Sequence, residues 1–125
     1  MKAAMDELLA LERAFWTGDR RFFEKNTDAE CLVAFSPDMA GVMENKELAA
    51  TVQDGNRWKT LDLDLKGTMQ PSDDFFLLTY EAKAMRADGD EYHALVSSGY
   101  VRRADGWKMM FHQQTPVPAA HRSPR

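Results

Sequence analysis

The sequence lacks most of the features that mark disulfide frameworks, metal sites and membrane spans. Its single cysteine, Cys31, cannot form an internal disulfide, and no His or Cys residues stand at metal-ligand spacing. No apolar run approaches the roughly 20 residues that a membrane-spanning helix requires. The charged N-terminus also has no signal-peptide core. We therefore expect a cytoplasmic protein with no metal and no membrane contact, in which Cys31 is a buried, inert thiol.

Clustered positive charge and phosphate-binding motifs are missing as well. The chain has 20 acidic and 16 basic residues, a net charge of −4, and its basic residues cluster only as the pairs 20–21 and 102–103. Because phosphate binding depends on clustered Lys and Arg, we expect no nucleic-acid partner. Glycine-rich phosphate loops, a Gly-x-Ser-x-Gly elbow and nucleotide fingerprints are absent, so no cofactor is predicted.

The length of 125 residues suits one domain. We assign residues 1–117 to this domain and expect 118–125, rich in Pro, Ala and Arg, to be a flexible tail. Apolar residues at helical spacing predict a helix over 2–17, and Asp19 can cap a short second helix to about residue 26. A strand is expected over 31–35, a short extended piece over 41–43, and a third helix over about 46–54.

The second half of the chain changes to the two-residue period of β-strands. Strands are expected over 61–66, 75–86, 91–103 and 107–116. The outline is an α+β fold: helices, then an antiparallel meander to which one early strand is added. A long curved sheet needs its concave face covered, and the N-terminal helices are available to do so.

Two turns set the register of this meander. Asp-Gly at 88–89 is a preferred pair for a two-residue hairpin turn, which would place Tyr80 opposite Ser97. At the next turn, a three-residue loop with a left-handed Gly106 would place Ser97 opposite Gln113. A two-residue turn there would shift the partners of the last strand.

These registers sort the side chains into two faces. The more apolar face is assigned to the core, and its polar groups would line a cavity: Tyr80, His93, Ser97 and Gln113. The opposite face carries an apolar patch, through which we expect two copies of the chain to dimerise sheet to sheet. The residues assigned to this interface are Val96, Tyr100, Met110 and His112.

Two stretches resemble a known superfamily. Residues 11–19 (LERAFWTGD) followed by Phe22-Phe23, and residues 105–108 (DGWK) followed by 112–116 (HQQTP), are similar to the nuclear transport factor 2-like superfamily, and within it to SnoaL-like small proteins of unknown function. The resemblance implies a cone of the cystatin-like type, a bent sheet wrapped around a long helix with a pocket at its open end. Members include ketosteroid isomerases, dehydratases, polyketide cyclases and non-enzymatic domains, so the fold does not give the function.

The chain lacks the catalytic residues that the resemblance to ketosteroid isomerases implies. Its first-helix tyrosine would fall near Glu12, its base aspartate near Phe35 or Ser36, and its second aspartate near Ser98 or Gly99. None of the three expected residues is present at these positions, although a shift of the alignment by two or three residues would bring Asp38 to the position of the base aspartate. Steroid isomerase chemistry is therefore not expected.

The expected function is that of a dimeric domain binding a small apolar or mixed-polarity molecule. Its apolar pocket would be lined by Trp16, Trp58, Ser97, Gln113, Met39 and Met43, although methionines equally serve as gap-fillers. One alternative is a cofactor-independent isomerase, dehydratase or cyclase-type enzyme that uses His93 and Tyr80 as acid and base. The competing interpretation of His93, a buried histidine bonded to backbone, is favoured. A second alternative is a non-catalytic dimerisation module.

Overall fold

The computed structural model describes residues 2–52 and 58–117. Within them the elements are α1 (Lys2–Thr17), α2 (Arg20–Asn26), β1 (Thr27–Ser36), β2 (Met39–Glu44), α3 (Asn45–Ala50), β3 (Trp58–Ser72), β4 (Phe75–Arg86), β5 (Glu91–Arg103) and β6 (Gly106–Pro116). The strands form one sheet in the order β2-β1-β6-β5-β4-β3. Only β1 and β6 pair in parallel; the other neighbours are antiparallel.

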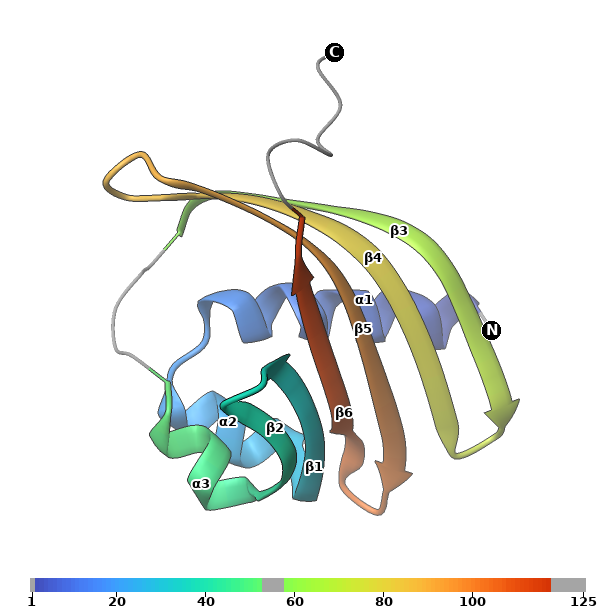
Figure 1. Ribbon diagram of the computed structural model, residues 1–125. Helices are drawn as coiled ribbons and strands as arrows, with labels where there is room; N and C mark the ends of the chain where they lie inside the picture. Colours follow the sequence, from blue (N-terminus) through green and yellow to red (C-terminus); the bar gives the residue numbers. More distant parts are fainter. Residues whose placement is uncertain (1, 53–57, 118–125) are drawn as a thin grey trace.

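The sheet is strongly curved and wraps around the first helix. Figure 1 shows β3, β4 and β5 bending over α1, while α2 and α3 lie beside the short strands β1 and β2. The predicted α+β architecture, a curved sheet around N-terminal helices, is confirmed. The early strand was predicted too short: β1 covers ten residues and joins the sheet beside β6.

Helix α1 supplies the centre of the core. Leu8, Phe15 and Trp16 are buried at helical spacing, as predicted, and Glu12 lies among them with none of its surface exposed. The chain then turns sharply at Gly18, where an added Cβ would lie 2.8 Å from the Ala14 carbonyl oxygen. No other residue type fits this turn without a shift of the backbone.

The predicted cap of α2 is confirmed. The Asp19 side chain accepts a hydrogen bond from the Phe22 N–H at 2.9 Å, which starts the helix directly after the turn. Both phenylalanines of α2, Phe22 and Phe23, meet Phe15 edge to face at 4.9 Å between ring centroids. These contacts hold the short helix against the end of α1.

The first hairpin turn is longer than the sequence suggested, and this changes the register of the sheet. The Arg86 N–H donates to the Asp90 carbonyl at 2.7 Å, and the last regular pair is Met85 with Glu91. Gly89 takes the left-handed conformation, with φ of +97°. The predicted pairing of Tyr80 with Ser97 is therefore wrong by one residue.

A one-residue slip moves every side chain of β5 to the other face. Tyr80 instead pairs with Val96, so Val96, Ser98 and Tyr100 face inward with it and are buried. His93 and Ser97 pair with Lys83 and Thr79 on the outer face.

The second turn is the two-residue alternative, followed by a compensating bulge. Arg103 pairs with Gly106 across the turn, and Gly106 has a φ of +122°. Farther along, Met110 is an extra residue between the pairs Tyr100–Met109 and Gly99–Phe111. The bulge restores the predicted pairing of Ser97 with Gln113.

The last strand consequently faces the helices with a different set of residues. Trp107, Met109 and His112 are buried on the inner face. The expected inner positions Phe111 and Gln113 lie on the outer face instead, because they follow the bulge.

Several further expectations concern single elements. Cys31 is 1% exposed, which confirms its predicted burial, and this burial raises the pKa of its thiol to about 12. Helix α3 is shorter than predicted, and β3, predicted over 61–66, begins at Trp58 and ends at Ser72. The predicted tail 118–125 and the predicted end of the third helix at 54 lie outside the described residues. No helix in the described part of the chain is both long and apolar enough to cross a membrane.

Candidate functional site

A cavity of about 370 Å³ lies where the end of α1 meets α2, α3 and the sheet. Its size falls in the range of small-molecule sites. Most of its lining residues are aromatic or aliphatic: Phe15, Trp16, Phe23, Phe35, Met39, Leu48, Val52, Trp58 and Met109. The four polar lining residues are Thr51, Arg86, His112 and Gln114.

One wall is a cluster of aromatic rings. Trp16 and Trp58 meet edge to face at 5.4 Å between centroids, and Trp58 stacks on Tyr92 at 5.9 Å. The Arg86 guanidinium lies 4.6 Å from the centre of the Trp58 ring. The structure therefore places the predicted residues Trp16 and Trp58 on the cavity wall, together with the Arg86 cation, which was not predicted there.

A chain of hydrogen bonds crosses the polar side of the cavity. The Tyr92 hydroxyl donates to Gln114 Oε1 at 2.8 Å, and Gln114 Nε2 lies 3.0 Å from His112 Nε2. His112 Nδ1 in turn lies 2.7 Å from Ser98 Oγ. Because the amide nitrogen of Gln114 can only donate, His112 Nε2 accepts and its proton resides on Nδ1.

The protonation state of His112 follows from its surroundings. Burial lowers the pKa of His112 below its ordinary value of 6.5, while the negative charge of Glu12 acts in the opposite direction. The imidazole is thus neutral at neutral pH, and both of its nitrogens have protein partners.

A second polar network lies deeper, between α1 and the sheet. The hydroxyls of Tyr80 and Tyr100 donate to the two carboxylate oxygens of Glu12, the first at 2.5 Å, and Trp16 Nε1 donates to the Tyr80 hydroxyl at 2.9 Å. Burial, followed by the charge of Glu12, raises the pKa of both tyrosines well above the ordinary value. Both hydroxyls therefore stay protonated and serve as donors.

The sequence did contain a signal for this network. Glu12 stands in the apolar stripe of α1, four residues after Leu8 and four before Trp16. A carboxylate in such a stripe is rarely buried without partners. Two tyrosines on inner strand positions could supply them.

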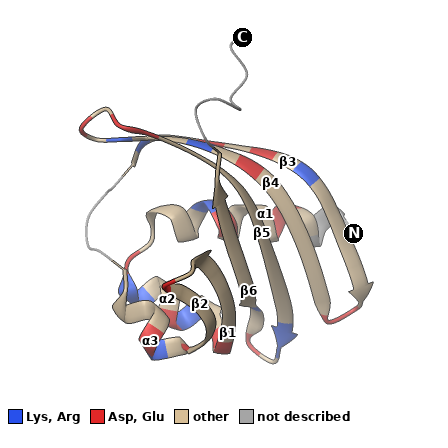
Figure 2. Ribbon diagram, viewed as in Figure 1, with Lys and Arg blue, Asp and Glu red and all other residues tan. Residues whose placement is uncertain are grey.

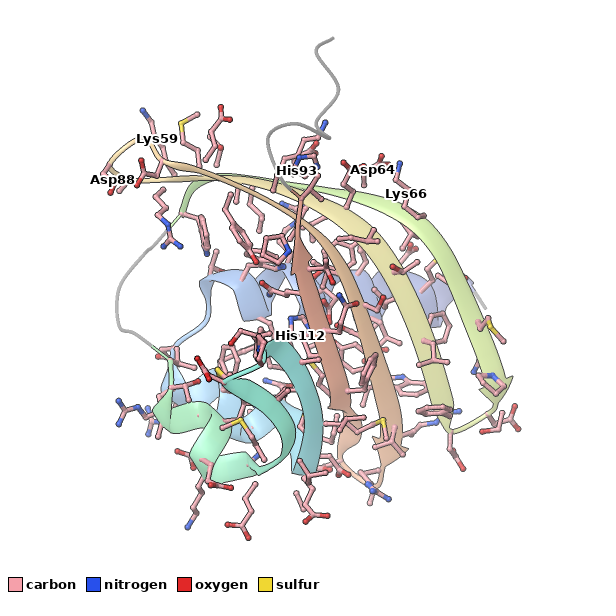
Figure 3. The ribbon with its side chains drawn as sticks, in the orientation of Figure 1. Lys59, Asp64, Lys66, Asp88, His93 and His112 are labelled. Atoms are coloured by element: carbon pink, nitrogen blue, oxygen red, sulfur yellow. The ribbon has the colours of Figure 1, made fainter. Side chains whose placement is uncertain are left out.

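The predicted catalytic pair is not brought together. Tyr80 belongs to the buried network, whereas His93 is on the outer face, where its Nε2 contacts Glu81 Oε2 (Figure 3). The other two predicted polar residues also lie outside the cavity. Ser97 donates to Thr79 Oγ1 at 3.0 Å, and Gln113 Nε2 donates to the Leu95 carbonyl at 3.4 Å. These placements are corrections caused by the register of the first hairpin.

Two predicted methionines differ in position. Met39 lines the cavity. Met43 is partly buried against the core but does not line the cavity. Among the residues that the structure describes, no group of three or more His, Cys, Asp or Glu side chains could hold a metal ion.

The predicted dimer-interface residues are mostly internal. Val96 and Tyr100 are fully buried and His112 is 6% exposed, so none of these three can meet a partner subunit. Met110, the extra residue of the bulge, has its sulfur near the outer side of Gly99, together with Leu77 and Phe111. An apolar outer face exists, and of the four predicted interface residues Met110 lies on it.

That outer face carries a continuous apolar row. Each member is the cross-strand partner of the next, from one edge of the sheet to the other: Val42, Leu32, Phe111, Gly99, Leu77 and Met69. The outermost of these are well exposed, Val42 by 63% and Met69 by 64%. Figure 2 shows β5 and β6 free of charged residues over most of their length.

Solved structures of low sequence identity share this architecture. A nuclear transport factor 2-like protein of unknown function from Prochlorococcus marinus has a TM-score of 0.68 at 15% identity, over 92% of this chain and 94% of that one. The chain has the nuclear transport factor 2-like fold. A ketosteroid isomerase-like protein from Erwinia carotovora atroseptica gives a TM-score of 0.67 at 15% identity, over 89% and 91% of the two chains. The association domain of C. elegans CaMKII gives 0.66 at 15% identity, over 91% and 96%.

These likenesses establish the fold and nothing finer. No protein-family model and no curated protein matches the sequence. The expected fold resemblance is confirmed, but structures that share a fold at such low identity carry many different activities.

Proposed function

We propose that this protein is a homodimeric domain that binds a small, largely apolar molecule in the cavity beside Trp16 and Trp58. The observation that carries the proposal is a cavity of about 370 Å³ with a mainly aromatic and aliphatic wall. Each Å² of apolar ligand surface removed from water there contributes roughly 25 cal/mol. The aromatic faces of Trp16 and Trp58 add a preference for ligands with flat rings.

Binding without chemistry is favoured because the titratable groups inside are already engaged. A general base needs a free lone pair within reach of the proton that it removes. His112 uses both ring nitrogens in the chain from Tyr92 to Ser98, and the carboxylate of Glu12 accepts from two tyrosines. The cavity is arranged for shape and apolar contact more than for proton transfer.

A catalytic alternative rests on one specific contact. His112 Nε2 is held only by Gln114, and both residues line the cavity. A ligand that displaced the Gln114 amide would meet a neutral imidazole with a free lone pair. An isomerase or dehydratase-type activity would therefore use His112, and not the predicted pair of His93 and Tyr80.

The homodimer is supported by the apolar row on the outer face. Apolar patches of this extent on a single chain usually mark an interface, and a two-fold dimer is the commonest arrangement. The row runs from Val42 on β2 to Met69 on β3, so a second sheet could cover it along its whole length. The similarity to an association domain agrees with such an assembly.

The binding site is tested by blocking the cavity. Thr51 is exposed at the cavity wall, so Thr51→Trp should fill the opening with little effect on the core. We expect the affinity for the neutral fluorescent probe N-phenyl-1-naphthylamine to fall by about tenfold or more, an effect of about 1.4 kcal/mol. Thr68→Trp, at an exposed position away from the cavity, is the matched control and should bind as the wild type does. Equal binding by Thr51→Trp and wild type would refute the proposal.

A further inference from the structure

Resting on the proposed pocket, we propose that the ligand is an amphipathic organic anion, with a flat apolar body in the cavity and an acidic group held at its mouth by Arg86. Carboxylates and sulfonates share the required chemistry: a planar or tetrahedral group of acceptor oxygens that a guanidinium binds with two parallel N–H groups.

Arg86 is held in place by its partner across the strands. It is the last residue of β4, it pairs with Trp58 on β3, and its guanidinium lies 4.6 Å above the Trp58 ring. Stacking on an aromatic face restrains the guanidinium and leaves the N–H groups on its edge free to donate. The same tryptophan forms part of the cavity wall, so the cation and the apolar surface are presented together.

Among residues 2–52 and 58–117, no carboxylate forms an ion pair with Arg86. Two other strand-end arginines are paired, Arg102 with Asp74 and Arg103 with Asp28. Arg86 differs from these two in having no carboxylate partner within the described part of the chain, and it lies beside an apolar cavity.

The other lining residues do not oppose an anion. No aspartate or glutamate lines the cavity, and His112 is neutral, so Arg86 is the one charged group among the described lining residues. Gln114 gives one of its two amide N–H groups to His112, and the second can donate to an acceptor on the ligand. The wall thus offers hydrogen-bond donors to the polar part of a ligand, which suits an acid and not an amine.

Two probes with the same ring system separate charge from apolar contact. 1-Anilinonaphthalene-8-sulfonate carries one sulfonate, and N-phenyl-1-naphthylamine is the neutral molecule without it. Both would be titrated by fluorescence into the wild type and into Arg86→Gln, Arg86→Lys and Thr51→Trp at low ionic strength. Arg102→Gln is the matched control, because Arg102 also stacks on a tryptophan, 5.0 Å above Trp107, but does not line the cavity.

The proposal makes a different prediction for each probe. Arg86→Gln should weaken binding of the sulfonate about tenfold and leave binding of the neutral probe within about twofold of the wild type. The affinity of Arg86→Lys for the sulfonate should lie between those of the wild type and Arg86→Gln, since lysine keeps the positive charge but lacks the planar guanidinium. Added salt should weaken sulfonate binding by the wild type more than by Arg86→Gln. Arg102→Gln should change neither affinity.

Failure of this inference can be told apart from failure of the pocket. If Arg86→Gln weakens both probes equally, Arg86 acts by packing on Trp58 and the anion is refuted. Unchanged sulfonate binding in Arg86→Gln, with loss of binding in Thr51→Trp, would leave the pocket standing and refute the role of Arg86. If neither probe binds, or if Thr51→Trp binds both as the wild type does, the pocket itself is wrong and the anion with it.

Discussion

Replacement of Glu12 by alanine tests how the core tolerates a charged residue. The carboxylate has none of its surface exposed and accepts from Tyr80 and Tyr100, while Trp16 donates to Tyr80. Its removal leaves two buried hydroxyls without acceptors, each costing about 1–3 kcal/mol, and opens a cavity besides. We expect a total loss of about 3–5 kcal/mol, a large share of the 5–15 kcal/mol typical of a domain.

The measurement is urea unfolding followed by tryptophan fluorescence, with protein concentration held constant because assembly shifts apparent stability. Glu7→Ala, at an exposed position of the same helix, is the control and should change stability by no more than about 0.5 kcal/mol. Glu12→Gln keeps one acceptor and should lose less than Glu12→Ala.

A triple variant separates the value of the network from the cost of breaking it. Glu12→Leu combined with Tyr80→Phe and Tyr100→Phe removes every partner at once, so no hydroxyl of the pair is left unsatisfied. Buried polar groups replaced together by apolar ones often cost little, and we expect this variant to recover most of the stability lost in Glu12→Ala. A loss below about 1 kcal/mol in Glu12→Ala, or a triple variant as unstable as Glu12→Ala, would refute the account of a closed, buried network.

Three further predictions concern acid stability, assembly and thiol reactivity. Because the pKa of His112 is lowered in the folded state, the unfolded chain binds more protons than the folded one below about pH 6.5. The free energy of unfolding should therefore fall by up to about 1.4 kcal/mol for each pH unit below that value. His112→Gln should remove this slope, measured by urea unfolding between about pH 7 and pH 5. Leu32→Asp, at a 47% exposed position of the apolar row, should give a monomer by light scattering, whereas Ala10→Asp on the exposed side of α1 should not; an unchanged dimer would contradict the interface. Cys31 should react with a thiol reagent only after unfolding, since it is 1% exposed and its pKa is raised to about 12; rapid labelling of the folded protein would show that β1 opens.

The sequence predicted local structure well and long-range register poorly. The stripe of Leu8, Phe15 and Trp16, the Asp19 cap and the alternation along β3 to β6 are local signals. They predicted each of these elements, although β3 extends beyond the predicted 61–66 at both ends. The parallel pairing of β1 with β6 has no such signal, because it joins segments about eighty residues apart whose contact depends on the whole sheet.

The lining of the cavity was predicted only in part, because it depends on the long-range register of the sheet as well as on local signals. Trp16, Trp58 and Met39 were placed in the cavity by their residue type and their position near helix and strand ends. His112 and Gln114 were placed on the wrong face, because the turn at Gly89, the second turn and the bulge at Met110 together determine the phase of the end of β6. The predicted two-residue turn and the observed longer turn both accept Asp-Gly and differ in length by a single residue. The sequence around the turn does not distinguish them.

The extra residue at Met110 has a consequence for how such a chain can vary. Before it, Trp107 and Met109 alternate into the core; after it, His112 and Gln114 alternate into the cavity. A strand one residue shorter at this point would pair regularly and still present the same four side chains inward. The loss of Met110 would therefore straighten the strand without changing which of its side chains form the inner face.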